Sequence, residues 1–270
     1  MQNSVKTIIF IISLILFHVL LSAQEDPRQI YDRATGQMLS GNMEIMMELD
    51  IKDKKGRVKE KGFEVLVASF GDVEKTKMSW QKPEAAKGTT VIFTELPDET
   101  GVIEVYTPSN GKIRKLKATP ENMAMVGSEA QMTGMTSRDP DDLMFTHLPS
   151  QEIEGKPCHR IEVKDKNSTD QARGELLVEM DTYRIVQITV FDKNGTKTSF
   201  VTLSDFQPVE GMETKVQPMR IITEDYENKK QTEMRVLKVA SRTDLTEDDF
   251  LLPLRAGDVA ESSSTFRNAD

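Results

Sequence analysis

Cysteine and histidine are scarce in this sequence, and their scarcity excludes several kinds of chemistry. Cys158 is the single cysteine, so no disulfide can form within the chain. Outside the N-terminal apolar run there are two histidines, His147 and His159, and their spacing is not that of zinc ligands. Structural roles explain all three residues better, and we predict no metal site and no cofactor.

Catalytic motifs are missing as well. The sequence has no Gly-x-Ser-x-Gly nucleophile elbow and no glycine loop that would cradle a phosphate. The acidic cluster of Asp139, Asp141 and Asp142 lacks the alternating ligand spacing of a calcium loop, and helix capping explains it better. We therefore expect a protein that is not an enzyme.

Basic side chains are outnumbered by acidic ones, which gives the chain a net charge of −9. A negative chain is repelled by the phosphates of nucleic acids and by anionic membrane surfaces. We expect no nucleic-acid partner and no adsorption of the whole molecule on an anionic membrane.

A long apolar run occurs at the N-terminus, from Ile8 to Leu21. Lys6 precedes it and Ala23 supplies the small residue of a cleavage site, as in a secretory signal peptide. The run is shorter than the roughly 20 apolar residues of a membrane span. We predict a signal peptide at residues 1–23, cleaved after Ala23, and a periplasmic mature protein that does not span the membrane.

The mature chain begins with the pattern of an amphipathic helix. Asp26 is a suitable cap and Pro27 a suitable first residue, while Ile30, Ala34 and Met38 recur on one face. Gly41 is the expected stop.

Alternation of apolar and polar residues then predicts antiparallel strands, joined by turns at 53–56, 108–111 and 192–195. About five strands precede residue 119 and about five follow residue 148. The strand centres are 43–51, 63–67, 78–80, 91–93, 102–106, 161–163, 176–180, 185–191, 200–206, 216–222 and 234–239.

Between Thr119 and Leu148 the alternation is lost, and several of the chain's 15 methionines gather there. Thr119-Pro120 and Asp139-Pro140 are typical of helix starts. We predict short helices that form a lid over the apolar face of the sheet. Thr246 and Asp249 predict one more helical turn, and the polar residues 256–270 a disordered tail.

Several short motifs occur in an order that resembles the LolA-like family, in particular its outer-membrane lipoprotein-sorting branch. The motifs are Trp80-x-Lys82-Pro83 with Lys87-Gly88-Thr89, Val105–Pro108 with Gly111–Lys115, Gly127-Ser128 with Met135 and Asp141–Leu143, Phe191–Gly195, Leu203–Phe206, Val209–Met212 and Asp249-Phe250. The resemblance extends from about Asp26 to Arg255, and we predict one domain at residues 24–255.

This resemblance implies a mainly β fold, a curved antiparallel half-barrel with an N-terminal helix and a short helical lid insertion. It also implies a cavity that accepts acyl chains of lipids or lipoproteins, and an inner-membrane transporter as a candidate partner. The strand faces indicate these cavity residues: Met47, Phe63, Val65, Trp80, Phe93, Met123, Met125, Met132, Met135 and Phe145.

Two functions from different classes therefore stay open. The first is a non-catalytic periplasmic carrier of acyl chains in outer-membrane lipoprotein or lipid trafficking. The second is an envelope protein-interaction or sensor module with a closed core and no lipid ligand. A filled interior would favour the second function.

Overall fold

A short helix near the N-terminus, α2 (Pro27–Gly36), is the first element in the computed structural model, which describes residues 25–38, 40–96, 101–119, 122, 140–167 and 172–252. Asp26 caps it, since its carboxylate accepts a hydrogen bond from the backbone N–H of Arg28 at 3.1 Å. The prediction that Gly41 ends the helix is wrong. The helix stops at Gly36, whose carbonyl accepts a hydrogen bond from the Lys215 ammonium at 2.8 Å.

Thirteen strands form one antiparallel sheet in the described part of the chain. The first six are β1 (Met43–Lys52), β2 (Val58–Phe70), β3 (Val73–Lys82), β4 (Thr90–Glu95), β5 (Gly101–Thr107) and β6 (Lys112–Lys117). The other seven are β7 (Leu143–Ile153), β8 (Lys156–Asp165), β9 (Arg173–Glu179), β10 (Ile185–Phe191), β11 (Lys197–Val209), β12 (Met212–Asp225) and β13 (Lys230–Ser241). The described residues also form three 3-10 helices: η1 (Glu84–Ala86), η3 (Pro140–Asp142) and η4 (Glu247–Phe250).

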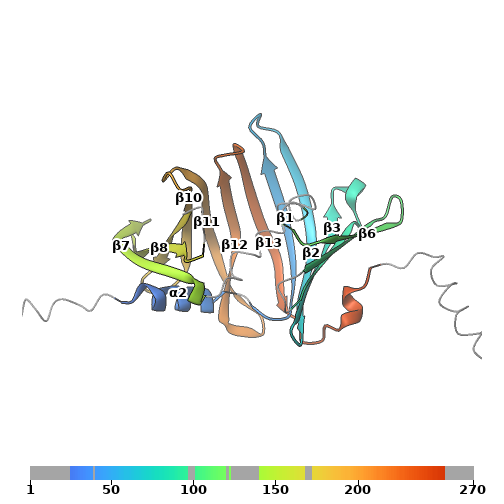
Figure 1. Cartoon of the computed structure of the whole chain (residues 1–270), viewed down its shortest axis with the longest axis horizontal. Helices are drawn as coiled ribbons and strands as arrows, with labels where there is room; N and C mark the ends of the chain where they lie inside the picture. The colour runs from blue at the N-terminus through green and yellow to red at the C-terminus, as the bar shows by residue number, and fades with distance from the viewer. Residues whose placement is uncertain are drawn as a thin grey trace, which may run out of the picture.

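The sheet is two meanders joined in the middle by the pairing of β1 with β13. Strands β6 and β7, which are consecutive in sequence, lie at opposite edges of the curved and open sheet (Figure 1). This arrangement confirms the predicted half-barrel.

The predicted turns are confirmed by their backbone geometry. Gly56 and Gly195 close the β1–β2 and β10–β11 hairpins with φ values of 78° and 77°, a region that glycine adopts without strain. Asp53 and Asp192 each accept a hydrogen bond from the backbone N–H two residues later.

The prediction of helix up to Leu148 is wrong, because residues 143–148 belong to β7. Pro140 starts only the single turn η3, and Phe145 and His147 then pair with Val163 and Ile161 of β8. Pairing with β8, which the local sequence does not reveal, overrides the helix-start signal. At the other predicted start, the Thr119 hydroxyl accepts a hydrogen bond from the backbone N–H of Asn122 at 3.3 Å.

The signal peptide at 1–23, the tail at 256–270 and most of the lid insertion lie outside the described residues. These stay predictions, as do the domain bounds 24–255.

One face of the sheet is apolar over nearly its whole width, and we call it the apolar face. Helix α2 covers its β7–β11 half, where Ile30 and Ala34 pack against Ile161, Val178 and Leu203. In the other half, strands β1–β6 and β13 contribute a second cluster of buried side chains. Ile221 of β12 contacts both clusters and joins them into one face.

The opposite, outer face holds the C-terminal turn η4. Phe250 packs edge-to-face on Phe70 with ring centroids 5.5 Å apart, and the Lys77 ammonium donates to the carbonyl of Asp249 at 2.6 Å. As predicted, Thr246 and Asp249 cap each other: the Thr246 backbone N–H and hydroxyl donate to the Asp249 carboxylate at 2.8 and 3.0 Å.

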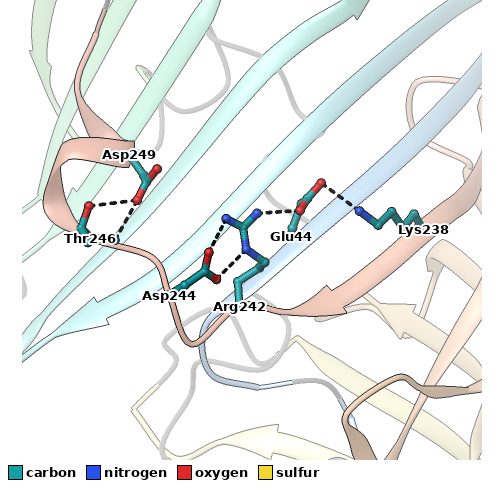
Figure 2. A network of polar contacts seen from close by, with 6 residues as sticks. All are labelled: Glu44, Lys238, Arg242, Asp244, Thr246 and Asp249. Carbon is teal, nitrogen blue, oxygen red and sulfur yellow. Dashed lines mark hydrogen bonds and ion pairs between the residues drawn. The ribbon is translucent and has the colours of Figure 1, made fainter.

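An ionic network beside this turn joins the segment after β13 to β1 (Figure 2). Glu44 on β1 accepts from Arg242 at 2.7 Å and from Lys238 at 3.3 Å. Arg242 also holds Asp244 through two contacts of 2.8 and 3.0 Å. The hydrogen bond from Arg242 holds the pKa of Glu44 below its ordinary value.

The buried half of β1 gives a first prediction. Leu49 is fully buried and Met46, on the outer face of the same strand, is 37% exposed. Leu49→Ala should lower the free energy of unfolding by about 2–5 kcal/mol, because it leaves a cavity, and Met46→Ala by less than about 1 kcal/mol. Urea unfolding followed by circular dichroism measures both. Equal losses would contradict the assigned faces.

The Glu44 network gives a second prediction, in the pH dependence of stability. Because folding lowers the pKa of Glu44, its contribution is complete above the ordinary value of 4.5 and is lost as the pH falls through the folded value. Glu44→Gln should therefore destabilise the protein at pH 7, and its difference from wild type should shrink in acid. Thermal melts across pH test this, with exposed Glu227→Gln as the control. A difference that does not depend on pH would contradict the assignment.

Candidate functional site

The candidate site is the part of the apolar face on β1–β6 and β13. Antiparallel register places its side chains in rows that cross the strands. One row consists of Leu116, Ile103, Phe93, Thr76 and Val67, and a second consists of Val105, Val91, Met78, Val65 and Ile45. Because side chains alternate between faces along each strand, every member of a row points to the same side.

Phe63 and Trp80 lie at the centre of this site. Their rings meet edge-to-face with centroids 4.9 Å apart, a favourable aromatic geometry. Phe63 pairs across the strands with Met47 as well as with Trp80. The site therefore has a rigid aromatic centre with a flexible methionine beside it.

The structure brings together five of the predicted cavity residues. Phe63, Val65 and Trp80 belong to the buried core of this cluster, and Met47 and Phe93 pack against it while partly exposed. Met123, Met125, Met132 and Met135 lie outside the described residues. Their place in a cavity stays a prediction.

Phe145 belongs to the other half of the apolar face. It packs on Tyr31 of α2 with ring centroids 4.8 Å apart, beneath the helix. A pocket with a volume of about 10 Å³ lies nearby, between α2 and strands β10–β12. That volume is enough for about one water molecule and is far too small for an acyl chain.

Sequence reasoning missed the contributions of β5, β6 and β13 to the site. The missed side chains are Ile103, Val105, Leu116, Met234, Val236 and Val239. Their alternation with polar neighbours was visible in the sequence, for example Met234 and Val236 on either side of Arg235. What the sequence did not show is that β13 pairs with β1 and so shares its face.

The outer face is charged, and several of its ions are paired. Arg235 of β13 contacts Asp50 of β1 at 2.8 Å, and Lys82 contacts Glu48 at 2.5 Å. On β8 and β9, desolvation of Glu175 is outweighed by hydrogen bonds from Arg173 and Arg160, which keep its pKa below the ordinary value. Such a face is suited to water and leaves the apolar face as the place for an apolar ligand.

Cys158 and His159 sit in settings that suppress reactivity. Burial raises the pKa of the Cys158 thiol, so the thiol stays protonated at neutral pH. Burial likewise lowers the pKa of His159, whose ring lies 5.9 Å from that of His147. Within the described ranges, no three His, Cys, Asp or Glu side chains are grouped so as to hold a metal ion.

No helix among the described residues is long and apolar enough to cross a bilayer. The position and chemistry of these side chains give a predominantly apolar surface on one side of a curved sheet. Its residues can make dispersion contacts with an apolar molecule.

Solved structures from three bacteria share this architecture. A domain from Vibrio parahaemolyticus described as an outer membrane lipoprotein-sorting protein superposes with a TM-score of 0.66 and 17% identity, covering 83% of this chain and 95% of that one. A DUF1329 family protein from Desulfovibrio piger gives 0.68 and 16%, covering 84% and 98%. A LolA superfamily protein from Nitrosomonas europaea gives 0.57 and 17%, covering 84% and 100%.

Sequence comparison supplies the family. No curated protein is significantly similar in sequence. A family model described as "Uncharacterized protein" matches residues 72–252, which is most of the chain and includes β3 to β13. The chain therefore belongs to this family of uncharacterized proteins, and it has the LolA-like fold that its sequence motifs predicted.

Proposed function

We propose that this protein is a non-catalytic carrier that binds the acyl chains of lipids or lipoproteins against its apolar face. The observation that carries the proposal is the unbroken row structure of that face, from Leu116 at one edge to Ile221 beyond the centre of the sheet. A soluble domain normally closes such a face with its own helices. Here α2 covers the β7–β11 half, and η1 contributes Ala86 to the other half.

Transfer of an acyl chain onto this face is favourable because each buried CH₂ contributes about 0.8 kcal/mol. Methionine side chains adapt to apolar ligands of variable shape. Met47, Met78 and Met234 are distributed over the face, so that it can accommodate chains of different length and branching.

Binding requires the face to open. Phe63 and Val65 are 2% and 1% exposed, so a ligand must displace groups that already cover them. Partly buried Phe93, Val105 and Leu116 near the β6 edge are the first apolar groups that an arriving chain would contact. An acyl chain that displaces these groups exchanges one set of dispersion contacts for another, so the net free energy of binding is small enough for the cargo to be released.

The relatives support this proposal at the level of the fold. The Vibrio parahaemolyticus domain is described as an outer membrane lipoprotein-sorting protein, and it aligns with most of this chain. With the export signal predicted at residues 1–23, the present protein would carry its ligand in the periplasm. An inner-membrane transporter is then a reasonable donor of that ligand.

A second candidate function is an envelope protein-interaction or sensor module with a closed core. The nearly complete burial of Phe63 and Val65 and the small pocket under α2 favour it. The two functions differ in one observable property, which is whether the protein retains a lipid when it is purified.

Native mass spectrometry of the mature protein, followed by organic extraction, tests the carrier. We expect a stoichiometric lipid or fatty acid on the wild type. Phe93→Asp should abolish retention, because a carboxylate facing an acyl chain loses its hydration without a partner, at a cost of several kcal/mol, about 2–7 even for a neutral polar group.

Thr94→Asp is the matched control, since it adds the same charge to the neighbouring position on the outer face of β4. It should retain the lipid. Circular dichroism must show both variants folded. A wild-type protein that stays free of lipid after incubation with envelope lipids and lipoprotein would instead support the interaction module.

A further inference from the structure

The edge strand β6 carries an unusual density of positive charge. Lys112, Arg114, Lys115 and Lys117 occupy four of the positions of this short strand, in a chain whose net charge is −9. All four are exposed. An edge strand with lysines resists pairing with other sheets, which explains basic residues here but not their distribution between the two faces.

Register distributes these cations in an informative way. Arg114 pairs with Val105, and Leu116 pairs with Ile103, so Arg114 lies on the apolar face. Lys112 is two residues before Arg114 on the same strand and therefore points to the same face. Lys115 lies on the outer face, where it contacts Glu104 at 2.7 Å. Lys117 shares the outer side with Lys115, while Lys112 and Arg114 border the apolar face.

Lys112 and Arg114 have no carboxylate within ion-pair distance among the described residues. The acidic residues of the same face on β3 and β4, Glu74 and Glu95, lie opposite each other in the register, at the far ends of those strands. Glu95 lies four residues beyond Val91, the residue in the row of Arg114. The β6 end of the apolar face is therefore positively charged, beside the partly buried apolar groups Phe93, Val105 and Leu116.

We propose that Lys112 and Arg114 bind the phosphate of an anionic phospholipid whose acyl chain lies on the apolar face. This inference rests on the proposed carrier function and names the class of its ligand. A guanidinium matches two phosphate oxygens at once, and an ammonium beside it adds a second charge-assisted contact. The headgroup would stay in water at the sheet edge while the chain is buried.

The proposal agrees with the overall charge of the protein. A chain of net charge −9 is repelled by an anionic membrane as a whole, so the ligand would be bound as a single molecule and not as a surface. An acidic protein segment would meet the same cations, but it would not need the apolar rows next to them. The adjacency of charge and apolar surface favours an amphiphile.

Isothermal titration calorimetry with lysophospholipids below their micelle concentration tests this. Lysophosphatidylglycerol and lysophosphatidylcholine with one and the same acyl chain differ in net headgroup charge. The wild type should bind the anionic lipid more tightly. The double variant Lys112→Gln/Arg114→Gln should lose about twentyfold in affinity for it, about fivefold per cation, and should bind the zwitterionic lipid as before.

The matched control is Lys54→Gln/Lys55→Gln, which removes the same charge from the exposed β1–β2 turn. It should leave both affinities close to those of the wild type. Equal losses in the two double variants would overturn the β6 site, because they would reflect net charge alone. Equal binding of the two lipids by the wild type, or full competition by glycerol 3-phosphate without an acyl chain, would also overturn it.

These outcomes separate the two proposals. Binding of both lipids without preference would leave the carrier intact and remove only the headgroup site. Binding of neither lipid would remove both proposals, and a complex with an acidic peptide would then point to the interaction module.

Discussion

The pairing of β1 with β13 is the constraint on which the rest of this structure depends. It joins strands that are nearly 200 residues apart in sequence, with Leu49 opposite Met234 on the apolar face. On the outer face Arg235 bridges back to Asp50 at 2.8 Å. Without this pairing the chain would be two separate meanders, each with an apolar face too narrow to enclose anything. With it, the rows of both meanders merge at Ile221 into one face.

As a consequence, the two faces of the sheet differ in side-chain chemistry, and the two halves of the apolar face differ in how they are covered. The outer face is ionic; it holds η4 through Lys77 and Phe70, and the network of Glu44 and Arg242 lies beside that turn. The apolar face is covered by α2 on one half, which fixes that half as a conventional core. The other half combines a buried aromatic centre, Phe63 and Trp80, with partly exposed apolar groups and a cationic border at β6. An amphiphilic ligand fits that combination.

Much of this could be predicted from the sequence, because period-two alternation and hairpin turns are local signals. The strands around Met43–Ile51 and Phe63–Val67, the Asp53 and Asp192 turns, and the Thr246–Asp249 cap were all expected. Features that depend on distant partners were not. At the helix end, the Gly36 carbonyl accepts a hydrogen bond from Lys215 of β12, and Phe145 is in a strand because β8 pairs with it. The cationic border at β6 could not be predicted for the same reason, because the face on which Arg114 lies is known only from its pairing with Val105.

Trp80 offers the most direct measurement, because it is the only tryptophan of the chain and lies at the centre of the proposed binding face. Fatty acids brominated at successive positions along the chain can be titrated while its fluorescence is recorded. The carrier account predicts saturable quenching that is strongest for bromine at one depth of the chain, as a bound chain alongside Trp80 requires. Emission that is unchanged by every brominated fatty acid, with the protein folded, would contradict it and leave a closed core.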